Sequence, residues 1–147
     1  HNELGLLYYN TDRFPQAISS FKNAIESGIT QSNDFKENLG FAYIFARQPD
    51  NAEPILQDLI TRKAGNKELL RDIAEAYYTA KLYDNSLAYC QRLMEMDMKD
   101  GKALYQAGLC FQKKGDTDRG QKMCDAAIEL DPSLTKMRTQ KSFSTGL

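Results

Sequence analysis

Bulky apolar and small residues recur along the chain at the i, i+3 and i, i+4 spacings that place side chains on one face of a helix. Polar turn signals separate these segments, and they lie at Asn10 to Asp12, at Arg47-Gln48-Pro49-Asp50 and at Lys114-Gly115-Asp116. The pattern therefore predicts pairs of amphipathic helices, each pair joined by a tight turn.

The same pattern occurs four times. A first motif of a small residue followed three positions later by an aromatic residue recurs in steps of 35, 34 and 34 residues, as Leu4-Gly5-x-x-Tyr8, Leu39-Gly40-x-x-Tyr43, Ile73-Ala74-x-x-Tyr77 and Ala107-Gly108-x-x-Phe111. A second motif lies twelve residues after the first, as Ala17-x-x-x-Phe21, Ala52-x-x-x-Leu56, Ser86-x-x-x-Cys90 and Gly120-x-x-x-Cys124. The small residues allow two helices to approach closely. Because one helix pair cannot bury its apolar face alone, neighbouring pairs must stack into a solenoid.

These motifs resemble the tetratricopeptide repeat (TPR) family, whose 34-residue pattern is W-x2-L-G-x2-Y, then A-x3-F, then P. The resemblance runs from His1 to Pro132. The last repeat matches best, from Leu104 through Gly108 and Phe111 to Pro132. The Trp position of the family pattern is not kept, and it holds His1, Lys36, Leu70 and Leu104.

The resemblance implies an all-α fold, a right-handed α-α superhelix (solenoid) of four TPR-like helix-turn-helix repeats plus a C-terminal capping helix. A single array would occupy residues 1–147, with repeats at about 1–31, 32–66, 67–100 and 101–132 and a capping helix and tail at 133–147. Helices are expected near 1–11, 15–27, 33–46, 51–64, 67–80, 84–98, 101–114 and 118–130. The capping helix would use Leu134 and Met137 to cover the apolar end of the stack.

In the resembling family the first helix of each repeat lines a concave groove that holds an extended peptide or a partner helix. The segment Leu39 to Ala46 is apolar around its whole circumference, so part of it is expected to face this groove. Packing against neighbouring inner helices, and self-association, are the alternatives. The predicted partner-binding residues are Leu6, Tyr9, Phe41, Ile44, Phe45, Arg71, Tyr78, Lys102, Tyr105, Leu109 and Lys113.

One known subclass, which binds chaperone tails through a carboxylate clamp, fits poorly. The clamp's first-helix positions here hold Asn2 and Leu6, and Glu75 follows Arg71 by one turn and would repel a carboxylate. An apolar, aromatic groove is therefore the better interpretation, with basic residues orienting the bound segment.

Composition excludes other partners. Nineteen basic and twenty acidic side chains give a net charge of −1, which provides no electrostatic reason to expect nucleic acid or an anionic membrane. The related pentatricopeptide family, which reads RNA, is disfavoured for the same reason. No apolar run approaches the roughly 18 residues of a membrane span, so membrane insertion is not expected.

Catalysis, metals and cofactors are not expected either. The only histidine is His1, and the cysteines Cys90, Cys110 and Cys124 lack the CxxC spacing of a zinc site. They are predicted to be buried and reduced, which favours the cytoplasm as the compartment. If the chain is part of a longer exported protein, a periplasmic or envelope location is expected instead. Asp116 and Asp118 resemble the start of a calcium loop, but Ala127 stands where a bidentate Glu is needed.

The sequence therefore predicts a non-catalytic protein–protein interaction scaffold without cofactors, binding a protein or peptide segment. The alternative is a structural spacer or self-association domain excised from a larger protein, forming homo-oligomers through the groove or the repeat ends.

Overall fold

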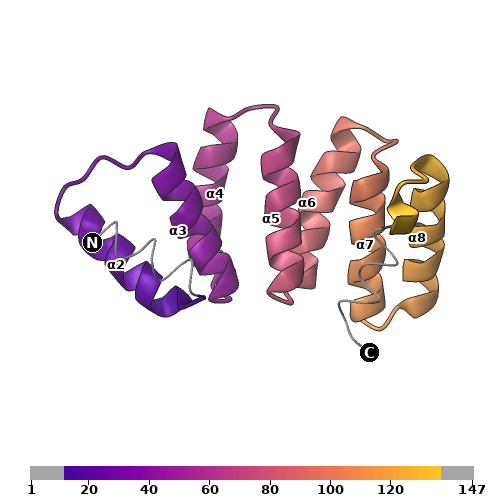
Figure 1. Ribbon diagram of the computed structural model, residues 1–147, viewed down its shortest axis with the longest axis horizontal. Coiled ribbons are helices and arrows are strands. Elements are labelled where there is room, and N and C mark those ends of the chain that lie inside the picture. The colour runs from indigo at the N-terminus through magenta and orange to yellow at the C-terminus, as the bar shows by residue number, and fades with distance from the viewer. Residues whose placement is uncertain (1–11, 137–147) are drawn as a thin grey trace. The chain divides into compact units, whose positions relative to one another are not determined.

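The computed structural model describes residues 12–136, which form helices and no strand. The elements are α2 (Phe14–Glu26), α3 (Asn33–Phe45), α4 (Pro49–Arg62), α5 (Lys67–Thr79), α6 (Tyr83–Met96), α7 (Gly101–Lys113) and α8 (Thr117–Leu130) (Figure 1). Each boundary lies within two residues of the sequence-based prediction, and the all-α class is confirmed. The helix predicted at 1–11 lies outside the described residues.

The chain divides into two compact units. Unit 1 comprises residues 1–69 with 79–82, and unit 2 comprises residues 70–78 with 83–147. In unit 1, α3 packs against both α2 and α4; in unit 2, α7 packs against both α6 and α8. Within each unit, these helices pack against their neighbours in the sequence, as helical repeats do.

The turns between paired helices share one backbone conformation. Asp12, Arg47, Lys81 and Gly115 occupy the same place in their repeats, and all four have a left-handed φ, between 60° and 96°. At Arg47 the N–H donates to the Ile44 carbonyl (2.9 Å), and the following N–H donates to the Tyr43 carbonyl (2.8 Å). This is the Schellman arrangement, which satisfies the last carbonyls of a helix and reverses the chain within a few residues.

The small residues of the two motifs lie where helices approach each other most closely. A Cβ placed on Gly120 would lie 2.5 Å from the carbonyl oxygen of Gly108, so the backbones of α7 and α8 are nearly in contact. At the equivalent place on α6, the hydroxyl of Ser86 donates to the carbonyl of Ala74 at 2.7 Å. The sequence prediction that these positions allow close approach is confirmed in the α3–α4, α5–α6 and α7–α8 pairs.

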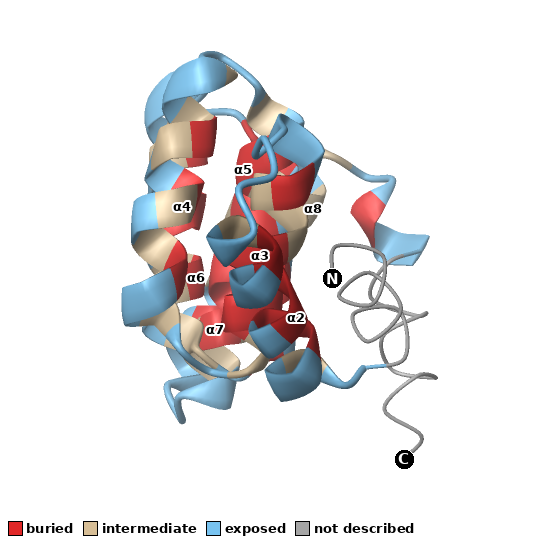
Figure 2. Cartoon of the chain, turned by 90° about the vertical axis from the view of Figure 1, so that its left-hand side faces the viewer, coloured by how far each residue is buried: buried red, intermediate tan, exposed pale blue. Residues whose placement is uncertain are grey.

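The buried side chains line the inner faces of the helices, and α4 keeps one side exposed (Figure 2). A further helical stretch begins at Leu134, whose side chain is fully buried in a cluster with Tyr105, Cys124 and Ala127. The start of the predicted cap therefore covers part of unit 2. The other residue assigned to the cap, Met137, lies outside the described residues.

Candidate functional site

The predicted partner-binding residues differ widely in exposure. Leu6 and Tyr9 lie outside the described residues. Of the others, Lys102 and Lys113 are exposed, Phe45, Arg71, Tyr78 and Leu109 are half-buried, and Phe41, Ile44 and Tyr105 are buried.

The exposure expected of Phe41 and Ile44 is wrong. Their exposed fractions are 7% and 0%. The reason is the position of α3, which has α2 packed on one side and α4 on another. Neighbouring helices thus cover the apolar circumference of α3. Phe41 and Ile44 are core residues, in agreement with the alternative that they pack against neighbouring helices.

Tyr105 requires a similar correction. Its exposed fraction is 2%, and it packs with Cys124, Ala127 and Leu134. Leu109 packs against the same cluster. The helical stretch that begins at Leu134 therefore covers an aromatic residue that the sequence assigned to the groove.

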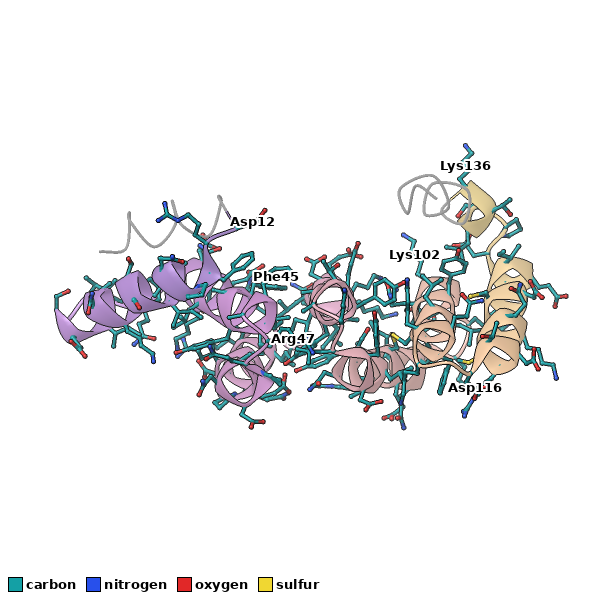
Figure 3. The ribbon with its side chains drawn as sticks, turned by 90° about the horizontal axis from the view of Figure 1, so that it is seen from below. Asp12, Phe45, Arg47, Lys102, Asp116 and Lys136 are labelled. Carbon is teal, nitrogen blue, oxygen red and sulfur yellow. The ribbon has the colours of Figure 1, made fainter. Side chains whose placement is uncertain are left out.

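Phe45 is the aromatic residue of α3 that remains accessible (Figure 3). Its ring stacks on that of Phe14, with the centroids 5.0 Å apart and the planes inclined by 27°. The pair borders an open hollow of unit 1 that Asp12, Thr79 and Ala80 also line. Unit 1 thus presents a stacked aromatic pair that a partner could cover.

Arg71 is an internal ion-pair residue as well as a surface residue. Its two terminal nitrogens donate to the two carboxylate oxygens of Asp100, at 2.8 and 2.7 Å. Asp100 is buried, and its Oδ1 also accepts the Ala103 N–H at 3.1 Å as the N-cap of α7. The prediction that Arg71 orients a partner stays untested, but most of its charge is compensated within unit 2.

A pocket of about 90 Å³ opens beside this ion pair, between α5, α6 and α7, and we call it the α5–α7 pocket. Its walls are mainly apolar, with a few polar groups from α5 and α7. The lining residues are Arg71, Ala74, Glu75, Cys90, Leu93, Lys102, Ala103 and Gln106. Such a combination of apolar walls and few polar groups is typical of ligand pockets.

Besides Arg71, which is paired with Asp100, two charges of opposite sign line this pocket. Glu75 on α5 and Lys102 on α7 are both exposed, and Lys102 points away from its helix (Figure 3). In the part of the chain that the structure describes, neither forms an ion pair. They are therefore available to a bound segment.

Burial governs the ionisation of the groups around the pocket. Burial, with a smaller contribution from Tyr83, raises the pKa of Tyr78 to about 12. The two rings meet edge to face, with centroids 5.6 Å apart. Burial likewise raises the pKa of the Cys90 thiol to about 12, so this pocket-lining cysteine is a neutral, weakly nucleophilic thiol at pH 7.

All three cysteines are free and buried, which confirms the prediction that they pack in the core. Within residues 12–136, no three His, Cys, Asp or Glu side chains are close enough to hold a metal ion together. None of the helices between these residues has the length and apolar character needed to cross a membrane.

Sequence reasoning missed several residues of the α5–α7 pocket, among them Leu93, Ala103 and Gln106. Gln106 offered one usable signal, because it is a polar residue between Tyr105 and Ala107, both of which are buried. The pairing of Arg71 with Asp100 had no comparable signal, since the two residues are 29 positions apart.

Paired helices, left-handed turns and small residues at the closest approach define an all-α helical-repeat protein. The tetratricopeptide repeat family matches residues 37–101 and again residues 101–134, and the chain belongs to this family. The fold supports a protein-interaction scaffold.

Among curated proteins, the chain is similar to the human protein O-mannosyl-transferase TMTC1, with 27% identity over 128 residues. The match covers 86% of this chain but spans only 14% of that protein.

Two solved structures share the fold. One is YrrB, described as a TPR protein with an unusual peptide-binding site, with a TM-score of 0.60, 22% identity, and coverage of 94% of this chain and 71% of YrrB. The other is the MamA protein, with a TM-score of 0.61, 21% identity, and coverage of 92% of this chain and 73% of MamA.

Proposed function

We propose that the chain is a non-catalytic scaffold that binds an extended or helical segment of another protein. The α5–α7 pocket carries this proposal, because it joins apolar walls to two exposed charges that are free to meet a partner. The peptide-binding site named for YrrB, which shares the fold, supports the same type of ligand.

The dimensions of the pocket favour a flexible segment over a folded surface. About 90 Å³ accommodates one side chain and not a helix. A partner must therefore present single side chains from a chain that runs along the helices. The stacked rings of Phe14 and Phe45 offer a partner a separate apolar contact on unit 1.

The accessible apolar surface predicts modest affinity. Covering one apolar side chain contributes roughly 1.5–3 kcal/mol. One such contact alone supplies less than the roughly 8 kcal/mol of a micromolar complex. Backbone hydrogen bonds and the charges of Glu75 and Lys102 must supply the remainder, so we expect dissociation constants in the micromolar range or weaker.

The non-catalytic role follows from what the site offers. Cys90 is kept neutral by burial, and Arg71 is paired with Asp100. The remaining groups suit recognition better than bond-making. The three free thiols support the cytoplasm as the compartment. We retain the four repeats, at about 1–31, 32–66, 67–100 and 101–132, as part of this proposal.

A second candidate is a structural spacer or self-association domain within a larger protein. The human relative favours it, because the matched region there is a small part of a much longer chain. Sedimentation velocity over a wide concentration range separates the two candidates. Oligomers that form with rising concentration and block peptide binding would support self-association.

A displayed library of short random peptides tests the scaffold. Peptides selected on the wild-type protein should bind a Glu75→Lys/Lys102→Glu variant at least about fivefold more weakly, because both surface charges are reversed. Glu129→Lys on α8 is the matched control, since this exposed charge lies outside the pocket, and it should leave binding unchanged. Failure to select any peptide, or equal losses in both variants, would overturn the proposal.

A further inference from the structure

One polar atom of the α5–α7 pocket lacks a partner in the described part of the chain. Nε2 of Gln106 is buried and reaches no hydrogen-bond acceptor, although its side chain lines the pocket. The Gln106 amide does oppose the burial-induced rise in the pKa of the Cys110 thiol, one turn further along α7. Sulfur is a weak acceptor, however, and the two groups do not meet in hydrogen-bond geometry. A buried donor in this state is stabilised by an oxygen acceptor that enters the pocket.

Another helix that lines the same pocket offers the complementary group. Glu75 extends from α5, and its carboxylate accepts hydrogen bonds but cannot donate them. The pocket thus presents a neutral N–H donor from one helix and an anionic acceptor from another.

Few side chains match both walls. A carboxylate would satisfy Gln106 and could approach Lys102, but it would be repelled by Glu75, so the two exposed charges would give it no net attraction. An ammonium or guanidinium group would pair with Glu75 but would leave the Gln106 donor without an acceptor. A hydroxyl carries both functions on a single oxygen, so it spans a shorter distance between its two partners than an amide does. A primary amide carries an acceptor oxygen and a donor nitrogen on the same carbon, and it matches both walls.

We propose that the α5–α7 pocket is a subsite that selects an asparagine or glutamine side chain of the bound segment. The inference rests on the proposed function and specifies its ligand. The ligand's carbonyl oxygen accepts from Gln106 Nε2, and its NH₂ group donates to the Glu75 carboxylate. The methylene groups contact the apolar wall formed by residues such as Ala74 and Leu93.

Small ligands test this selectivity without a known partner. Isotope-labelled wild-type protein is titrated with N-acetyl-glutamine methylamide, and then with the glutamate and norleucine analogues, while NMR spectra are recorded. The glutamine ligand should shift the side-chain NH₂ signals of Gln106 and the backbone amide of Ala103, with a millimolar dissociation constant. The glutamate ligand should bind about fivefold more weakly at pH 7, because repulsion by Glu75 offsets the attraction of Lys102 and the charged ligand loses more hydration on entering the pocket.

Two substitutions assign the effect to the two walls. Gln106→Leu should abolish the preference for the glutamine ligand over the norleucine ligand. Glu75→Gln should abolish the discrimination against the glutamate ligand. Glu129→Gln, which removes an exposed carboxylate from α8, should change neither of these two preferences. Circular dichroism confirms that each variant is folded, and the wild-type titrations remain informative if one variant is not.

Equal binding of all three ligands, or shifts confined to residues outside the pocket, would overturn the proposal. So would an unchanged Gln106 signal at ligand saturation, which is the result expected if the pocket holds only water. If the ligands fail in this way while displayed peptides still respond to charge reversal at Glu75 and Lys102, the subsite is refuted and the scaffold stands.

Discussion

The Arg71–Asp100 ion pair predicts a large effect on stability from a residue that the sequence assigned to ligand orientation. In an Arg71→Met variant the methylene stem is largely kept and the charge is lost. The Asp100 side chain, only 4% exposed, would then keep its negative charge in an apolar surrounding.

The structure sets the size of this effect. Removing one partner of a buried ion pair costs about 3–5 kcal/mol, since the other charge is left buried and uncompensated. Two features reduce the cost: the Arg71 side chain is 24% exposed, and Asp100 keeps its cap bond to the Ala103 N–H. We therefore expect a loss of about 3 kcal/mol, at the lower end of that range. Arg71→Lys, which keeps the charge but not the bidentate geometry, should lose about 1–2 kcal/mol.

Urea unfolding followed by circular dichroism measures these losses, and amide exchange in α5 and α7 locates them, because repeat proteins need not unfold in one step. Arg71→Met/Asp100→Asn is the decisive partner variant. It removes both charges, so it should be more stable than Arg71→Met alone. A loss below about 1 kcal/mol in Arg71→Met, which is typical of exposed pairs, would refute the reasoning.

Three further predictions concern packing, backbone and thiol chemistry. Gly120→Ala should lower the free energy of unfolding by about 2 kcal/mol, because the added methyl would meet the Gly108 backbone. Gly40→Ala should change it by less than about 1 kcal/mol, because its added methyl meets a movable Leu56 side chain at 2.9 Å. Equal melting temperatures of the two variants would contradict this. Lys81→Gly should raise the unfolding free energy by about 0.5–1 kcal/mol by relieving a left-handed φ of 66°, and a lower urea midpoint would contradict this. Cys90, with its pKa raised to about 12, should resist a disulfide reagent at pH 8 until the protein unfolds; rapid labelling of native protein would show that it is accessible.

The sequence predicted those features that depend on local periodicity. Helix boundaries follow from the resemblance of the motifs to the repeat family, and the close approach of Gly108 to Gly120 follows from small residues in register. The exposure of α3 could not be predicted in the same way. An apolar circumference shows that Phe41 and Ile44 must be covered, but it does not say whether their own neighbours or a partner cover them.

The polar part of the site depends on tertiary register, which no local pattern contains. Arg71 and Asp100 meet because the α6–α7 turn places one carboxylate beside α5. Tyr105 is covered because the helical stretch that begins at Leu134 folds back on it. In both cases the accessibility of the residue was decided by a segment distant in the sequence.

The different closest contacts within the helix pairs have a mechanical consequence. In the α7–α8 pair, the backbone at Gly108 lies against the backbone at Gly120, and neither can yield without moving a whole helix. In the α3–α4 pair, the contact at Gly40 is made by the end of the Leu56 side chain, which can rotate. Under a stretching force, the helices of the α3–α4 pair should slide past each other first, while the α7–α8 pair behaves as a stiff hairpin. The α7–α8 pair is thus the stiffer of the two.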